Sequence, residues 1–389
     1  MALQLSLRPT EARRQEPRRL RQRDRFDAFP RTRSARWLVR LLFAFPYMLP
    51  TMFAMGRADS VDTPNAQLLQ HVAQIPWDRA DASWLGEIYP PLSTLIAAGI
   101  PGGRAGLSIA GAFIAGIFLQ KMLEVMVQRR FRPSTAAILL IALAANPLFF
   151  YTATENFPAF LGLAFFGLGI ADIVRFVAWG NTQSGFRAGM FLMLATLSDL
   201  SGLAYVLTAA AAAPFLRLGR HGQRGARGAN VLVIVYPTVA SLIAVLLLNS
   251  FFLGNPIGSV GTRLLAGTTE RFESVGPLFQ TPSGWLLVAS VLSAWLMALI
   301  VRRPGSILVS TLVFGALITA FVLGLLPPGS AGNTFIAMTL MAIALIPTPK
   351  RRLLVVLMNV VAILQIGIAW TSAFNRDIVV QWMSALGVL

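Results

Sequence analysis

The residues best suited to chemistry lie in the segment 56–88, where carboxylates, amides and a histidine interrupt an otherwise apolar sequence. Asp59 and Asp62 follow an apolar stretch directly. A carboxylate at a membrane surface is well placed to take a proton from a hydroxyl group, and nearby cations can hold a departing phosphate. A solvated loop whose acids do no chemistry is the alternative for this segment. The candidate cations are Arg57, His71 and Arg79.

The elements that must position these residues are membrane helices. The chain has 389 residues, of which 56% are hydrophobic and 13% charged, whereas soluble domains are about 25% charged. Separate apolar runs of about 20 residues indicate an all-α polytopic membrane protein. The chain contains no cysteine, which excludes disulfides, thiolate nucleophiles and Cys-based metal sites, and its two histidines are far apart in sequence.

The apolar runs predict about ten transmembrane helices in one domain, 37–389, behind a disordered, Arg-rich cytoplasmic tail, 1–36. The tail carries much of the net charge of +17. Beside a membrane helix, this charge indicates topology and anionic lipids as partners rather than nucleic acid. The expected spans are 37–55, 105–127, 134–152, 157–177, 229–251, 284–301, 306–326, 333–347 and 353–373, with a broken pair over 188–216.

The distribution of charge predicts an orientation in the plasma (inner) membrane. With the N-terminus inside, nearly every Lys/Arg cluster falls on the cytoplasmic side. The tail aside, twelve acidic residues remain, and ten of them map to the outer face. Insertion rules do not explain that bias, so we expect the active face outside. Asp172 and Glu124 map to inner helix ends, where local cations are expected to satisfy them.

Two stretches fit the spanning rule poorly. Residues 89–101 are too short to cross a bilayer and predict an interfacial helix within the outer loop 56–104. The stretch 188–216 is too long for one helix, and Asp199 sits in its middle. It predicts two short helices that meet at a polar turn, 198–202, an arrangement that usually lines a cavity.

This order of features resembles the GT-C membrane glycosyltransferases, most closely the polyprenyl-phosphate-sugar-dependent mannosyltransferases of the DUF2029 type. The resemblance covers most of the chain in architecture, but in letters only Ile88–Leu92 (IYPPL). It implies that an Asp of the first outer loop is the catalytic base, Asp59 in first place and Asp62 in second. It also implies that the outer loop 252–283 covers the active site. The substrate-binding candidates are Arg57, His71, Arg79, Tyr89, Glu155, Asn156, Asp199, Arg263 and Arg271.

The activity implied is inverting transfer of a sugar from a polyprenyl-phosphate donor to a hydroxyl of a glycan or glycolipid. No cofactor is required for this reaction. A divalent metal is possible, but no spacing of acids indicates one, so no metal ligand is assigned. Two other functions stay open. One is a transporter or flippase for a lipid-linked or polar solute, and the other is a non-catalytic scaffold in an envelope complex.

Overall fold

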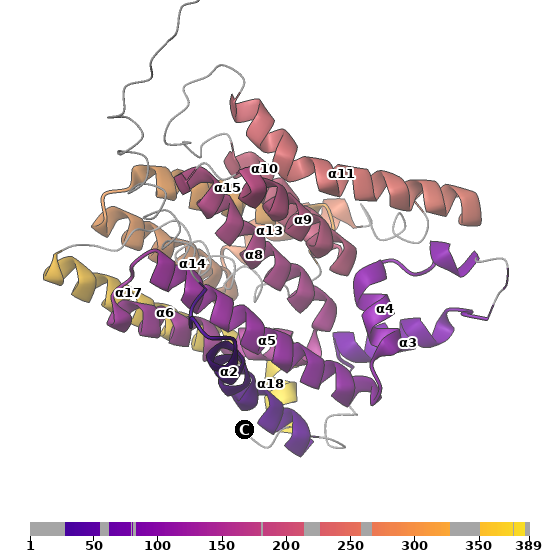
Figure 1. Ribbon diagram of the computed structural model, residues 1–389, viewed down its shortest axis with the longest axis horizontal. Coiled ribbons are helices and arrows are strands. Elements are labelled where there is room, and N and C mark those ends of the chain that lie inside the picture. The colour runs from indigo at the N-terminus through magenta and orange to yellow at the C-terminus, as the bar shows by residue number, and fades with distance from the viewer. Residues whose placement is uncertain are drawn as a thin grey trace, which may run out of the picture.

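The computed structural model is a bundle of helices (Figure 1), and every regular element among its described residues is helical. The structure describes residues 28–54, 62–78, 80, 83–179, 182–213, 226–257, 267–326, 351–375 and 377–385. The long elements are α2 (Arg33–Ala54), α5 (Gly103–Gln128), α6 (Pro133–Ala144), α8 (Phe157–Trp179), α9 (Thr182–Ser198), α10 (Ser201–Ala212), α11 (Ala226–Leu253), α14 (Pro282–Ile300), α15 (Pro304–Val322) and α17 (Arg352–Phe374). The short ones are α3 (Pro64–Gln74), η2 (Ser83–Gly86), α4 (Pro91–Gly99), α7 (Pro147–Glu155), α13 (Thr268–Leu278) and α18 (Asp377–Ala385).

The multi-pass membrane class predicted from composition is confirmed. Six described helices, namely α5, α8, α11, α14, α15 and α17, are long and apolar enough to cross a bilayer, and the bent pair α6–α7 makes up to seven. The described part of the chain therefore does not reach the predicted number of about ten. The expected span 333–347 lies outside it. Helix α2 begins at Arg33, so residues 33–36 are helical and not part of a disordered tail.

The span predicted over 134–152 is bent in the structure, because α6 and α7 meet at an angle of 54°. Pro147 has no N–H group, and its ring cannot follow a continuous helical turn. The side chain of Asn146 instead accepts a hydrogen bond from the Leu148 amide at 2.9 Å and caps the new helix. The break is therefore a local consequence of the Asn-Pro pair.

The predicted break near Asp199 is confirmed, since α9 ends at Ser198 and α10 begins at Ser201. Gly202 permits this close turn: a Cβ atom there would lie 2.3 Å from the Ala195 carbonyl oxygen. Opposite the break, a Cβ atom on Gly162 of α8 would lie 3.6 Å from the Cβ of Asp199. The polar turn is thus held against α8.

Helix α8 forms the centre of the bundle and α11 lies at its edge. In the apolar window of α8, 78% of residues are buried, against 17% for α11. Leu232 and Phe251 on α11 are 65% and 83% exposed. Large apolar side chains exposed along a whole helix are expected where lipid, and not water, is the solvent.

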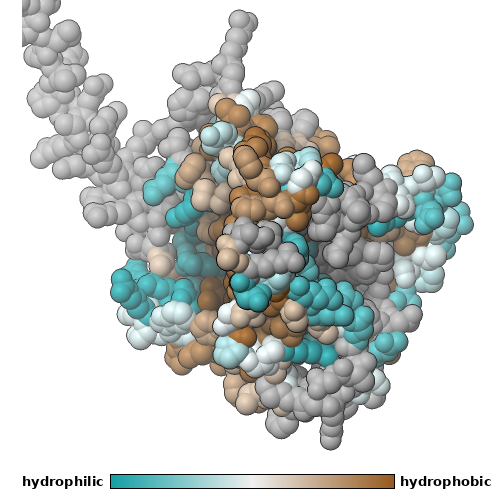
Figure 2. Space-filling model, turned by 90° about the vertical axis from the view of Figure 1, so that its right-hand side faces the viewer, coloured by the Kyte–Doolittle hydropathy of each residue, from teal (hydrophilic) through white to brown (hydrophobic). Residues whose placement is uncertain are grey.

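Polar residues concentrate at the two ends of the bundle. Arg104 and Glu124 are separated by twenty residues of α5, which corresponds to about 30 Å at 1.5 Å per residue, the thickness of a bilayer core. We call these the Glu155 end, where Arg104 lies, and the Glu124 end. Helices α3 and α4 cover the Glu155 end (Figure 1). The face on their side of the molecule mixes hydrophilic and hydrophobic residues (Figure 2).

Candidate functional site

The Glu155 end holds a buried ion pair. Nε of Arg104, at the start of α5, lies 3.1 Å from Oε2 of Glu155, the last residue of α7. Oε1 of Glu155 accepts a hydrogen bond from the indole N–H of Trp382 in α18 at 3.3 Å. The side chains of Arg104 and Glu155 are only 14% and 7% exposed. Three chain segments distant in sequence therefore converge on one carboxylate.

Asn65 attaches the first outer segment to this group. Its Nδ2 donates to the carbonyl oxygen of Thr154, and its Oδ1 accepts from the backbone N–H of Phe157, both at 2.8 Å. The side chain is fully buried. These two bonds place α3 on the junction between α7 and α8, and Asp62 lies two residues before α3.

Asp62 is exposed, and its Oδ2 accepts a hydrogen bond from Nε2 of Gln67 at 3.2 Å. The charges of Glu155, Arg104 and Asp62 all act on the hydroxyl of Tyr151. That hydroxyl is enclosed and makes no hydrogen bond to another residue in the described ranges. A buried donor without an acceptor costs free energy unless water or a ligand satisfies it. Tyr151 is therefore an enclosed hydroxyl donor at the Glu155 end whose hydrogen bond is not supplied by the described residues.

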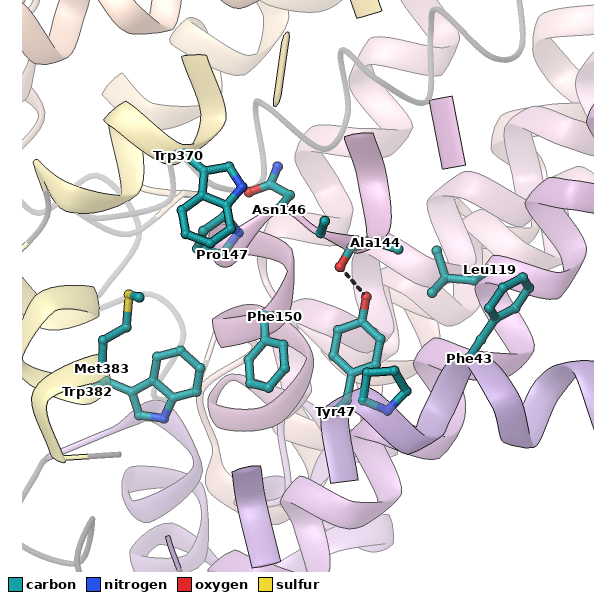
Figure 3. A pocket seen from close by; sticks show the side chains of 12 residues that line it. Phe43, Tyr47, Leu119, Ala144, Asn146, Pro147, Phe150, Trp370, Trp382 and Met383 are labelled. Carbon is teal, nitrogen blue, oxygen red and sulfur yellow. Dashed lines mark hydrogen bonds between the residues drawn. The ribbon is translucent and has the colours of Figure 1, made fainter. Parts of the chain in front are cut away.

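An apolar cavity adjoins this polar group (Figure 3). Its volume is about 420 Å³, and its walls come from α2, the break between α6 and α7, α17 and α18. Tyr47 donates a hydrogen bond to the carbonyl oxygen of Ala144 at the break, at 2.6 Å. Trp382 belongs to both sites, because its ring lines the cavity while its N–H binds Glu155. The site as a whole suits an amphiphile with a polar head and an apolar chain.

Two separately predicted residues, Tyr89 and Asp199, lie close to each other at the end of α9. The Tyr89 hydroxyl donates to the carbonyl oxygen of Thr196 at 3.2 Å, and the Ser93 hydroxyl donates to that of Ser198 at 2.8 Å. Both acceptors are carbonyl groups at the end of α9, which have no partner within the helix. Burial first, and then the charge of Asp199, raise the pKa of the Tyr89 phenol, so it remains a donor at neutral pH.

Asp199 itself caps the second half of the broken pair. Its Oδ2 accepts hydrogen bonds from the backbone N–H and the hydroxyl of Ser201, at the start of α10. Asn156 has a similar structural position, since its Oδ1 accepts from the Ala159 amide at 3.4 Å near the start of α8. Both polar side chains stabilise helix starts.

No contact among the described residues joins two other predicted residues, His71 and Arg271, to the Arg104–Glu155 ion pair. His71 lies in α3, and its Nε2 is enclosed without a hydrogen-bond partner in the part of the chain described. Arg271 lies in α13, which packs against α15. The remaining predicted residues, Arg57, Asp59, Arg79 and Arg263, lie outside the described residues.

Sequence reasoning missed Asn65, Arg104, Tyr151 and Trp382 as site residues. For Trp382 a signal existed: Val379, Trp382 and Met383 follow the spacing of an amphipathic helix. The other three carry no local pattern that separates them from loop or span residues.

Within the described residues, no three His, Asp or Glu side chains come together in a way that could hold a metal ion. No family model, curated protein or solved structure matches this chain.

Proposed function

We propose that this protein is an integral-membrane glycosyltransferase of the plasma membrane, with its active site at the Glu155 end, facing outward. It transfers a sugar from a polyprenyl-phosphate donor to a hydroxyl of a glycan or glycolipid. The observation that carries the proposal is the junction of two environments at Trp382: a 420 Å³ apolar cavity on one side and the polar group around Arg104, Tyr151 and Glu155 on the other. A lipid-linked sugar phosphate likewise joins an apolar chain to a polar head.

In the proposed reaction, Asp62 accepts the proton of the acceptor hydroxyl. The oxygen attacks the anomeric carbon from the face opposite the phosphate, and the bond between that carbon and the phosphate oxygen breaks. The electron pair leaves with the polyprenyl phosphate, and the configuration of the sugar inverts. A phosphate needs no general acid to depart, only hydrogen-bond donors and positive charge. In this proposal, Tyr151 and Arg104 supply these.

We assign the role of base to Asp62 on account of its exposure and its place next to α3. Asp62 accepts a hydrogen bond from Gln67, and its charge acts on the Tyr151 hydroxyl, which has no hydrogen-bond partner among the described residues. Asp59, the first choice from the sequence, keeps this role as the alternative.

The experiment compares envelope glycolipids by mass spectrometry in a deletion strain that expresses wild-type protein, Asp62→Asn, Asp59→Asn or Asp78→Asn at equal levels. Asp78 is an exposed acid of the same segment and is the matched control. We expect the deletion to lose one glycosylated species, Asp78→Asn to restore it, and one of the two other variants to leave it reduced at least 100-fold. Restoration by both Asp59→Asn and Asp62→Asn rules out the assignment of the base.

A transporter of a lipid-linked or polar solute is the second candidate, and the helix break at Asp199 favours it. Transporters place such breaks at the substrate site. The discriminating measurement is uptake into proteoliposomes by wild-type protein and by Asp199→Asn. Uptake that Asp199→Asn abolishes, together with unchanged glycolipids in the deletion strain, supports transport and removes the transferase.

A further inference from the structure

A second cavity lies at the Glu124 end, away from the site described above. Its volume is about 540 Å³, and α5, α8 and α9 form its walls, with Ala28 at one side. Unlike the cavity beside Trp382, it is lined by charged groups. Its charged and polar lining residues are Lys121, Glu124, Asp172, Arg175, Gln183, Ser184 and Arg187.

The two carboxylates of this cavity are buried and paired, as the sequence predicted for them. Glu124 accepts from Nζ of Lys121 at 3.1 Å and lies 3.4 Å from Nη2 of Arg175. Asp172 accepts from Nη1 of Arg175 at 2.8 Å and from Nε of Arg187 at 2.6 Å. Neither carboxylate offers a free face to the cavity, since they are only 3% and 2% exposed.

The cationic side chains, in contrast, keep charge and N–H groups that these ion pairs do not use. The cavity has three cationic side chains against two carboxylates, an excess of one positive charge. Arg187 binds Asp172 through Nε and Nη2, which leaves Nη1, and its side chain is 48% exposed. Nε of Arg175 is enclosed and has no hydrogen-bond partner in the described ranges. The carboxylates thus fix the direction of the two guanidinium groups without neutralising the cavity.

The backbone adds to this positive character. Helix α9 begins at Thr182, and Gln183 and Ser184 of its first turn line the cavity. The backbone N–H groups of a first helical turn have no acceptor within the helix and attract anions. Arginine forks that meet a helix start are a common arrangement for binding phosphate.

We propose that this cavity binds a phosphate group, carried either by the headgroup of an anionic lipid or by a free phosphate. The distance of about 30 Å along α5 from Arg104 puts the cavity at the level of lipid headgroups on the opposite surface of the membrane. Arg129, Arg130 and Arg132 follow α5 directly, so the sequence assigns this surface to the cytoplasm. The site is independent of the proposed transferase activity.

The test uses the full-length protein in nanodiscs. Inorganic phosphate is titrated into phosphatidylcholine nanodiscs, and phosphatidylglycerol is added to the lipid mixture in a parallel series. Thermal unfolding and native mass spectrometry report binding. A response to inorganic phosphate identifies a free phosphate as the ligand, and a response to phosphatidylglycerol alone identifies the lipid.

Arg187→Gln is the diagnostic variant, because Asp172 keeps Arg175 as a partner. Arg130→Gln, with an exposed side chain beyond the end of α5, is the control for general surface charge. We expect Arg187→Gln to weaken binding about tenfold, the loss of one charge-assisted hydrogen bond, and Arg130→Gln to change it less than twofold.

If Arg187→Gln does not fold, Lys121→Gln replaces it, because Glu124 keeps Arg175. The inference is overturned if neither phosphate nor phosphatidylglycerol binds the wild-type protein, or if Arg130→Gln and the cavity variant weaken binding equally.

Discussion

Removal of the Asn65 side chain is expected to release α3, and with it Asp62, without unfolding the bundle. Asn65→Ala deletes two hydrogen bonds of 2.8 Å in a fully buried position. Each contributes about 0.5–1 kcal/mol net, and the Phe157 N–H left without a partner costs about 1–2 kcal/mol more. The docking of α3 should therefore weaken by about 2–4 kcal/mol.

Hydrogen–deuterium exchange measures this directly. Exchange through local opening accelerates tenfold for each 1.4 kcal/mol, so amides of α3 should lose protection by about 30- to 700-fold. Amides of α5 and α8 should not change, because their own packing remains. Gln67→Ala is the matched control in the same helix: its single bond to Asp62 is exposed, and the expected change is below about threefold.

Two results would refute this reasoning. Protection of α3 within threefold of wild type in Asn65→Ala would show that Asn65 does not dock the helix. An equal loss of protection in α3, α5 and α8 would show that Asn65 supports the whole bundle, and the local account of the site would then be wrong.

Two further predictions concern the bundle itself. Arg104→Gln leaves the buried Glu155 carboxylate without its ion partner and should destabilise the protein by about 3 kcal/mol. The double variant Arg104→Gln with Glu155→Gln should recover part of this loss, and thermal unfolding in detergent checks both. A double variant that is no more stable than Arg104→Gln contradicts the account. Gly116→Ala should push α2 away from α5, because the new Cβ would lie 2.2 Å from the Arg40 carbonyl oxygen, and should lower stability by about 1–3 kcal/mol in the same assay. Gly315→Ala is the control: a Cβ there has nothing within 4 Å, so the change should be neutral or stabilising. Equal effects of the two variants would contradict the close packing of α2 on α5.

The sequence predicted the local breaks well where the residues that cause them are adjacent. The turn at Asp199 was predicted from a polar run inside an apolar stretch, and a short helix within 89–101 from an apolar run too short to cross a bilayer. The bend at Asn146–Pro147 falls inside the single span predicted over 134–152, because the apolar count across it is long enough for one span.

The candidate site was predicted only in part. Glu155, Tyr89 and Asp199 were identified as substrate-binding residues, and the structure brings Tyr89 to Asp199 and Glu155 to Arg104. His71 and Arg271 were selected for their charge and chain position, and no contact in the described ranges joins them to the Arg104–Glu155 ion pair. Charge and order along the chain indicate which end of the bundle a residue occupies, but not which neighbour it meets.

What the sequence determined by itself is the membrane class, the position of most helices and the two polar ends. In a hydrocarbon core every backbone N–H and C=O group must form its hydrogen bond within its own helix, so each helix is recognisable as a continuous apolar run in the sequence. The tertiary structure decided which polar groups share a site. Arg104 and Trp382 reach Glu155 across 51 and 227 residues of chain. Such encounters depend on how helices cross and where Gly116 and Gly202 let them approach, and no local pattern records that geometry.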